Sequence, residues 1–454
     1  MRIEVLQSKN QNNMNAIIVP GVTDLNKGDQ ALVWESVRLV QDTGMFETVY
    51  VLSNGDTPEE EHQLCFQTKQ KGIPLIQNII KHPRRGKHIQ DKVIQEGKID
   101  FVKQVATAGF DYLSRSFLIK FAKKTAVLKL FFSDKVVETV QTFANAHTVF
   151  VKGGGFIHAH GEKTAPYVIW YLLFYVNLAK ALGKKVVFLP NSYGPFEGLT
   201  VEKQVRDAFK KMELKLAREH ISANALGGLL GEEIKVLPDL GFYLMPKEKA
   251  YGKQVLNKYL GEYKKRTVGI TIRPWRFPGL ANPEALYEKY ISSVETLVHH
   301  LVSRNYQVLF FNQSMGPNTH EDDRNAIQHL SERLNPSDYV WINENFTCEE
   351  LKSIYSNLDF FVGTRFHSVI FSMTSGVPSL AIAYGGNKGR GIMRDFDLEE
   401  FVVHINDVEP TKLVAMFDQL EKKEESVRST LESKSDFLSV KRNETINLIK
   451  GSIR

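Results

Sequence analysis

Cysteine is scarce in this sequence. Only Cys65 and Cys348 occur among 454 residues, and they lie far apart. No CxxC pair and no Cys/His set with zinc-ligand spacing is present, which excludes the usual structural zinc frameworks. Two cysteines in a chain of this length are typical of a reducing compartment and do not predict a disulfide scaffold. We therefore expect no disulfide, no metal and no cofactor.

Long apolar runs are also missing. The first residues, MRIEVLQSKNQNN, lack the apolar core of a signal peptide. The most apolar stretch, residues 167–178, is too short and too aromatic to span a bilayer, so it predicts a buried helix. We expect a cytoplasmic protein, and any membrane contact would be peripheral, at the inner membrane face.

Familiar nucleotide and metal motifs are absent as well. Gly161-Glu162-Lys163-Thr164 carries a glutamate before its lysine, and no GxGxxG occurs, so neither a Walker loop nor a dinucleotide site is predicted. His158 and His160 form a His-x-His pair, but no neighbouring residue completes a ligand set. The acidic run 321–323 opens a predicted helix, where carboxylates are stabilised without a metal.

Charge is moderate overall and uneven along the chain. Hydrophobic residues make up 43% and charged residues 24%, with a net charge of +6, which is typical of a globular protein. Residues 69–135 hold 15 Lys and Arg against 5 Asp and Glu. This local excess is larger than the net charge, so the rest of the chain is slightly acidic. A concentrated basic segment predicts an acidic partner.

Short apolar runs alternate with helical runs in both halves of the chain, which predicts an α/β protein with parallel sheets. We expect two Rossmann-like, doubly wound domains that face each other across a cleft, with ligands at the carboxyl ends of the strands. The expected boundaries are an N-terminal domain over 1–245, a linker over 246–266, a C-terminal domain over 267–434 and a C-terminal helix over 435–454.

A basic helical insertion over about 60–146 interrupts this alternation. A helix is expected over 110–132, with Phe110, Leu113, Phe117, Phe121 and Leu128 on one stripe. One interpretation is a helical subdomain that packs on the first domain. The other is a basic amphipathic surface that meets anionic lipid or an acidic lipid-linked glycan.

Polar and glycine residues follow the first predicted strand. Gly28 permits a tight turn, and Asp29 can cap a helix that begins near residue 30. With Asn26, they would offer backbone N–H groups to an anion or a sugar hydroxyl, although a plain helix cap explains the same residues. Further along, three glycines (Gly153, Gly154 and Gly155) follow a strand over 148–151 and would let a ligand approach the backbone.

Cationic side chains follow several other predicted strands. Arg218 would point into the cleft, or pair with Glu219 or Asp239. Arg273 ends the strand that opens the second half, and Lys388 lies in a later loop rich in glycine. Each would add positive charge to one edge of a sheet, and a solvated basic loop is the alternative for Lys388.

The most informative motif is Gly363-Thr364-Arg365-Phe366-His367-Ser368, where a strand leads into an apolar helix. Arg365 offers a planar fork that suits a carboxylate or phosphate, and His367 can exchange a proton near neutral pH. Together with the helix start, they favour a small, highly charged anion. A structural Arg/His pair is the alternative.

Taken together, the motifs resemble the polysaccharide pyruvyltransferase family. They run in order from residue 26 to residue 389: Asn26-x-Gly28-Asp29-x-Ala31-Leu32, Gly153-Gly154-Gly155, Asn191-Ser192-Tyr193-Gly194-Pro195-Phe196, Arg218-Glu219-x-x-Ser222, Pro238-Asp239, Gly363-Thr364-Arg365-Phe366-His367-Ser368, Gly376-Val377-Pro378 and Tyr384-x-x-x-Lys388-Gly389.

The resemblance implies a fold like that of two-domain GT-B glycosyltransferases and transfer of a pyruvyl group from phosphoenolpyruvate to a sugar. It places Arg365 and His367, together with Arg218, in the donor site. Arg273 and Lys388 are added on position and charge, and His367 is the expected acid or base. The expected acceptor is a sugar, an oligosaccharide or a lipid-linked glycan, with no nucleic acid involved. The alternatives are a GT-B glycosyltransferase that uses a nucleotide sugar and a non-catalytic scaffold that binds an anionic metabolite.

Overall fold

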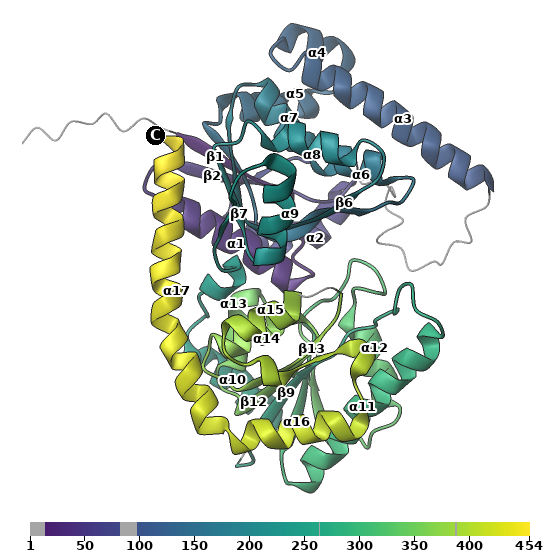
Figure 1. Ribbon diagram of the computed structural model, residues 1–454, viewed down its shortest axis with the longest axis vertical. Coiled ribbons are helices and arrows are strands. Elements are labelled where there is room, and N and C mark those ends of the chain that lie inside the picture. The colour runs from purple at the N-terminus through teal and green to yellow at the C-terminus, as the bar shows by residue number, and fades with distance from the viewer. Residues whose placement is uncertain (1–13, 82–97, 263, 386–387) are drawn as a thin grey trace, which may run out of the picture.

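Two parallel β-sheets, each covered by helices, form the body of the protein (Figure 1). The computed structural model describes residues 14–81, 98–262, 264–385 and 388–454. Within the basic insertion, the run of basic residues at 81–88 lies almost entirely outside the described residues. Among the described helices, none combines the length and the apolarity that crossing a bilayer requires.

The first sheet has the order β3-β2-β1-β4-β6-β7-β8, and all its pairs are parallel. Strand β5 pairs with the carboxyl-terminal half of β6, from Asn191 to Glu197. Its central strands are buried on both faces, which explains their continuous apolar runs. The strands are β1 (Asn15–Val19), β2 (Thr48–Leu52), β3 (Leu75–Ile76), β4 (Thr148–Val151), β5 (Gly154–His160), β6 (Lys185–Glu197), β7 (Leu214–Ala217) and β8 (Lys235–Val236).

Helices connect these strands as crossovers. They are α1 (Lys27–Gln41), α2 (Pro58–Gln70), α3 (Lys98–Lys120), α4 (Thr125–Phe131), α5 (Asp134–Asn145), α6 (Ala165–Leu172), α7 (Phe174–Ala181), α8 (Val201–Phe209), α9 (His220–Leu230) and the 3-10 turn η1 (Leu240–Tyr243). The insertion is shorter than expected, because β3 is a strand of the first sheet and α2 is the crossover that connects it to β2. The single helix expected over 110–132 is replaced by α3, a turn and α4.

The second sheet has the order β11-β10-β9-β12-β13-β14 and is also parallel. Its strands are β9 (Thr267–Thr271), β10 (Gln307–Phe311), β11 (Tyr339–Ile342), β12 (Phe360–Gly363), β13 (Ser379–Ala383) and β14 (Val402–His404). Its helices are α10 (Lys249–Leu260), α11 (Pro283–Ser303), α12 (Asp323–Ser331), α13 (Cys348–Tyr355), α14 (Phe366–Met373), α15 (Lys388–Asp395), α16 (Pro410–Lys422) and α17 (Glu424–Ile453), with 3-10 turns η2 (Glu399–Phe401) and η3 (Ile405–Asp407).

The last helix ties the two domains together. Helix α17 begins at Glu424, earlier than the expected 435, and runs along both domains (Figure 1). Lys185 at the start of β6 donates to the carbonyl of Ile453 over 2.7 Å, and Arg442 pairs with Glu35 of α1 over 3.0 Å. The chain therefore returns to the first domain after completing the second.

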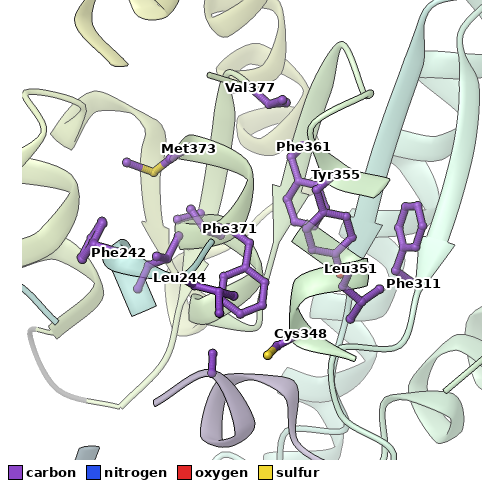
Figure 2. Packing of buried hydrophobic residues seen from close by; sticks show 14 of the residues in the cluster. Phe242, Leu244, Phe311, Cys348, Leu351, Tyr355, Phe361, Phe371, Met373 and Val377 are labelled. Atoms are coloured by element: carbon purple, nitrogen blue, oxygen red, sulfur yellow. The ribbon is translucent and has the colours of Figure 1, made fainter. Parts of the chain in front are cut away.

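A continuous apolar core also joins the domains. The residues on one face of the first sheet and on α1 belong to the same buried cluster as the second domain. At the junction, η1 packs on α14. Figure 2 shows Phe242, which lies in η1, and Leu244, which directly follows η1, beside Phe371 and Met373 of α14. This packing holds the carboxyl-end loops of the two sheets against each other.

Candidate active site

The start of α1 lies at the junction of the two domains. The Asn26 side chain caps the helix, because its Oδ1 accepts hydrogen bonds from the backbone N–H groups of Gly28 (3.0 Å) and Asp29 (3.3 Å). Asn26 also forms a β-bridge with Ser314 of the second domain, and the Lys27 N–H donates to the carbonyl of Gln313. The expectation that Asp29 caps this helix is wrong, since the helix begins earlier, at Lys27.

Asp29 instead connects two loops of the first sheet. Its carboxylate accepts a hydrogen bond from the Thr23 N–H over 2.9 Å and forms an ion pair with Lys152, whose side chain is almost fully buried. Lys152 stands directly after β4, and its Nζ also approaches the carbonyl of Gly21. A lysine and a carboxylate thus lie at the carboxyl ends of the two central strands.

The predicted glycine loop is partly a strand. Gly154 and Gly155 open β5. Gly154 has a φ of +155°, a backbone conformation that residues other than glycine rarely adopt. A Cβ at position 153 would lie 3.0 Å from the carbonyl oxygen of Pro190, so Gly153 allows the backbone to pack closely on β6. Asn191 of β6 donates to the carbonyl of Lys152 over 2.6 Å.

Arg218 is paired, as one of the two sequence interpretations expected. Its Nη1 forms an ion pair with Asp239, and its Nε donates to the Ser192 hydroxyl over 2.7 Å. Asp239 is buried and also accepts a hydrogen bond from the Gly241 N–H over 2.7 Å. Burial alone would raise the pKa of Asp239, but Arg218, together with His367, holds it well below its usual range.

His367 lies against the first domain, although α14 belongs to the second. Its Nε2 is 3.6 Å from Oδ1 of Asp239, close enough for an ion pair when the imidazole is protonated. The other edge of the ring lies over Gly28, since a Cβ at position 28 would be only 2.4 Å from Nδ1. Gly28 is therefore needed for the close approach of the imidazole, and not for the tight turn that the sequence suggested.

Arg365 occupies a buried ion-pair network within the second domain. Its Nε donates to Asp323 over 2.7 Å, its Nη1 to the Glu321 carboxylate over 2.7 Å and its Nη2 to the Glu321 carbonyl over 2.7 Å. All three nitrogens thus donate to protein, so the planar fork expected from the sequence is engaged by residues of this chain. The acidic run that the sequence marked as structural is what holds this arginine.

Arg273 shares Glu321 with Arg365. Its Nη2 lies 3.0 Å from the Glu321 carboxylate, and its guanidinium stands 4.3 Å above the Tyr384 ring and 4.9 Å from that of Trp275. Burial alone would raise the pKa of Glu321, but the two arginines hold it below its usual range. Arg365 and Arg273 thus share one carboxylate and fix each other's position.

The remaining candidates are less well defined. Lys388 begins α15 instead of lying in a glycine loop, and its side chain lies outside the described residues. His158 and His160 stand on β5 with their ring centroids 5.2 Å apart. Within the described parts of the chain, no group of three His, Cys, Asp or Glu is placed to hold a metal.

Several buried polar atoms near these strand ends have no hydrogen-bond partner among the described residues. Four of the atoms belong to residues that follow strands, and the fifth, Asn191 Oδ1, lies within β6. The four are Thr23 Oγ1, Arg273 Nε, Gln313 Nε2 and His367 Nε2. Because an unpaired buried polar group costs about 1–3 kcal/mol, such a set at facing strand ends is typical of a ligand site.

The structure also adds residues that were not named as candidates. Asp239 faces His367, Lys152 holds Asp29, and Glu321 joins the two arginines. Two of them could have been found from the sequence, since Asp239 belongs to the Pro238-Asp239 motif and Lys152 directly precedes the three glycines. Glu321 belongs to the acidic run noted above, but its pairing could not be predicted because its partner Arg365 is 44 positions away in sequence.

A family model for polysaccharide pyruvyl transferase matches residues 26–386. The chain belongs to the polysaccharide pyruvyl transferase family. This confirms the resemblance drawn from the motifs, and the match covers the start of α1, the glycines before β5 and the Arg365–His367 segment. The amylovoran biosynthesis protein AmsJ of Erwinia amylovora is 24% identical over 271 residues, which are 58% of this chain and 65% of AmsJ.

Solved structures of low identity share the fold. UGT73P12 of Glycyrrhiza uralensis has a TM-score of 0.56 at 10% identity, with 97% of this chain and 96% of that chain covered. A glycosyltransferase of Rickettsia africae has a TM-score of 0.51 at 14% identity, covering 98% and 99%. These similarities concern the fold alone, and they confirm the expected GT-B arrangement of two Rossmann-like domains.

Proposed function

We propose that this protein transfers a pyruvyl group from phosphoenolpyruvate to a sugar of a cell-surface polysaccharide or of its lipid-linked precursor, forming a pyruvate ketal. Family membership supports the reaction class. The observation that carries the proposal is the His367 imidazole, which lies between Asp239 and Gly28 where loops of both domains meet.

The donor carries a carboxylate and a phosphate on a small frame, so it needs cations and hydrogen-bond donors from more than one loop. Arg273 supports this role, because its Nε has no partner among the described residues and its guanidinium is held over two rings. Lys388 is a second proposed donor ligand by its position at the start of α15. Arg365 and Arg218 are then positioning residues, since each is engaged by buried carboxylates.

In the proposed reaction, the His367 imidazolium protonates the methylene carbon of phosphoenolpyruvate, which leaves an oxocarbenium-like carbon. One sugar hydroxyl adds to that carbon and returns its proton to the imidazole. The bond between that carbon and the phosphate oxygen then breaks. A second hydroxyl adds to the same carbon and closes the cyclic ketal, and its proton goes to the released phosphate. Asp239 places a negative charge beside the imidazole and can stabilise the protonated ring. These steps use only the donor, the acceptor and side chains of this chain.

The acceptor side of the proposal involves the first domain. Gly153–Gly155 precede or open β5, so this segment lies at a strand end where sugar hydroxyls can meet backbone groups. At the start of α1 the N–H groups of Gly28 and Asp29 already donate to Asn26, so this segment would shape the acceptor site without binding a hydroxyl through them. We propose that the enzyme works in the cytoplasm, where phosphoenolpyruvate is available.

A substitution at His367 tests the chemical role. His367→Gln should lower kcat for phosphate release from phosphoenolpyruvate at least about 100-fold, because general acid–base groups contribute about 10²–10⁴-fold. His299→Gln, an exposed histidine on α11, is the matched control and should match wild type. Turnover near wild type in the His367 variant would show that another group moves the protons.

A binding titration tests the donor. Phosphoenolpyruvate at 100 times its Kd should stabilise the protein by about 2.7 kcal/mol in thermal unfolding, while UDP-, GDP- and CMP-sugars should have no effect. Stabilisation by a nucleotide sugar, with none by phosphoenolpyruvate, would instead assign the protein as a glycosyltransferase.

A further inference from the structure

Large apolar side chains stand exposed on α3 and α4. Phe110 and Leu113 on α3 are 70% and 69% exposed, while Leu130 and Phe131 on α4 are 79% and 66% exposed. We name these four residues, with Phe117, the α3–α4 ridge. Of the stripe predicted from the sequence, Leu128 lies in the core and Phe121 packs against it.

The ridge is continuous across the turn between the helices. Positions 110, 113 and 117 follow the three- and four-residue spacing that aligns side chains along one face of α3. The Phe117 ring then reaches Phe131 on α4, with ring centroids 5.2 Å apart, and rests on Phe121 at 4.5 Å. One apolar strip therefore extends over both helices.

Cations surround this strip. Lys120, Lys123, Lys124 and Lys129 are exposed, and the ammonium groups of Lys120 and Lys124 each lie 5.7 Å from the Phe121 ring. Residues 106–135 contain six Lys and Arg and only two carboxylates, of which Asp111 is buried. The surface thus combines apolar tips with a positive border.

We propose that the α3–α4 ridge docks onto an anionic lipid bilayer. Aromatic and leucine side chains insert at the level of the head groups, and lysines around them attract the negative surface. A second copy of the chain is a poorer occupant, because a symmetric pair would bring the same cations together. Figure 1 shows α3 and α4 on the side of the first domain that faces away from the second.

The position of the ridge connects this surface to the proposed function, on which this step rests. A cavity of about 670 Å³ lies between α2, the residues after β3 and the insertion, and Arg115 and Lys135 are among its lining residues. Arg115 is two positions from Leu113, which places the two side chains on opposite sides of α3. A bilayer held on the ridge would therefore leave this cavity uncovered, and the sugar of a lipid-linked acceptor could enter it.

Vesicle binding tests the docking surface. Wild-type protein should co-sediment with vesicles of phosphatidylglycerol and phosphatidylcholine. It should bind at least about 25-fold less to phosphatidylcholine alone, since each nearby lysine adds about fivefold and at least two, Lys120 and Lys124, flank the strip. The binding should weaken at 1 M salt, where the Debye length is about 3 Å. The double variant Phe110→Ser/Leu113→Ser should partition at least about tenfold less. Leu199→Ser removes a leucine that is 82% exposed elsewhere and should bind as wild type does.

The outcomes separate this inference from the enzymatic proposal. Circular dichroism checks that the double variant is folded, and its phosphate release with a water-soluble acceptor should match wild type. Equal sedimentation with both vesicle types, or no change in the double variant, would overturn the docking surface. A loss of self-association in sedimentation velocity, without vesicle binding, would assign the ridge to an interface between copies. Vesicle binding does not depend on phosphoenolpyruvate, so either proposal can fail alone.

Discussion

Replacing Arg365 by methionine should mainly lower the free energy of unfolding of the second domain. Any loss of donor binding should be a consequence of this lower stability. The side chain is 5% exposed and donates to Asp323 and Glu321 through all three guanidinium nitrogens. Asp323 is fully buried and would keep only the backbone N–H groups of Gln313 and Ser314 as partners.

The expected cost follows from this burial. Removing one partner of a buried ion pair costs about 3–5 kcal/mol, because the remaining charge is left uncompensated. With a slope of about 2 kcal/mol per molar urea, the unfolding midpoint of the second domain should fall by about 2 M. Arg304→Met is the control, since Arg304 also pairs with two carboxylates, Asp418 and Glu421, but is 39% exposed. Its loss should cost less than about 1 kcal/mol.

Urea unfolding monitored by tryptophan fluorescence measures this effect, since Trp275 and Trp341 lie in the second domain. In a double-mutant cycle, Asp323→Asn should add little to Arg365→Met, because both remove the same interaction. A loss of stability below about 1 kcal/mol, combined with lost binding of phosphoenolpyruvate, would refute this reasoning and make Arg365 a direct donor ligand.

Three other substitutions test the site and the domain junction. Gly28→Ala should lower kcat about 100-fold, because the new Cβ would lie 2.4 Å from Nδ1 of His367. The control Gly228→Ala, whose Cβ would have no atom within 4 Å, should leave kcat unchanged. Equal kcat values for the two variants would contradict this reasoning. Asp239→Asn should cost about 3 kcal/mol in urea unfolding by breaking a buried ion pair; an unchanged midpoint would show that the pair contributes nothing. Burial lowers the pKa of Lys352 to about 7, whereas a lysine in the unfolded chain has a pKa of about 10.4. Between about pH 7 and pH 10.4 the unfolded chain therefore binds more protons than the folded protein, so the free energy of unfolding rises with pH in this range. Lys352→Met should remove up to about 4 kcal/mol of this rise between pH 7 and 10, and parallel pH profiles would exclude Lys352 as its source.

The alternation of strands and helices could be read from the sequence because it depends on local patterns. Strand β4 has the expected bounds, 148–151, since a continuous apolar run marks it. Element ends set by single side chains were harder to predict. Asn26 and Asp29 are both good caps, and only the backbone conformation shows that Asn26 caps α1.

The sequence by itself determined the fold class, the family and the residues that gather at the strand ends. Tertiary structure alone decided which of these residues are engaged by protein and which are not. Arg365 is held by carboxylates more than 40 positions away, and His367 meets an aspartate from the other domain. The apolar stripe of α3 looked like a packing face, yet Phe110 and Leu113 are exposed. Burial and ion pairing depend on contacts between distant segments, and no local pattern specifies those contacts.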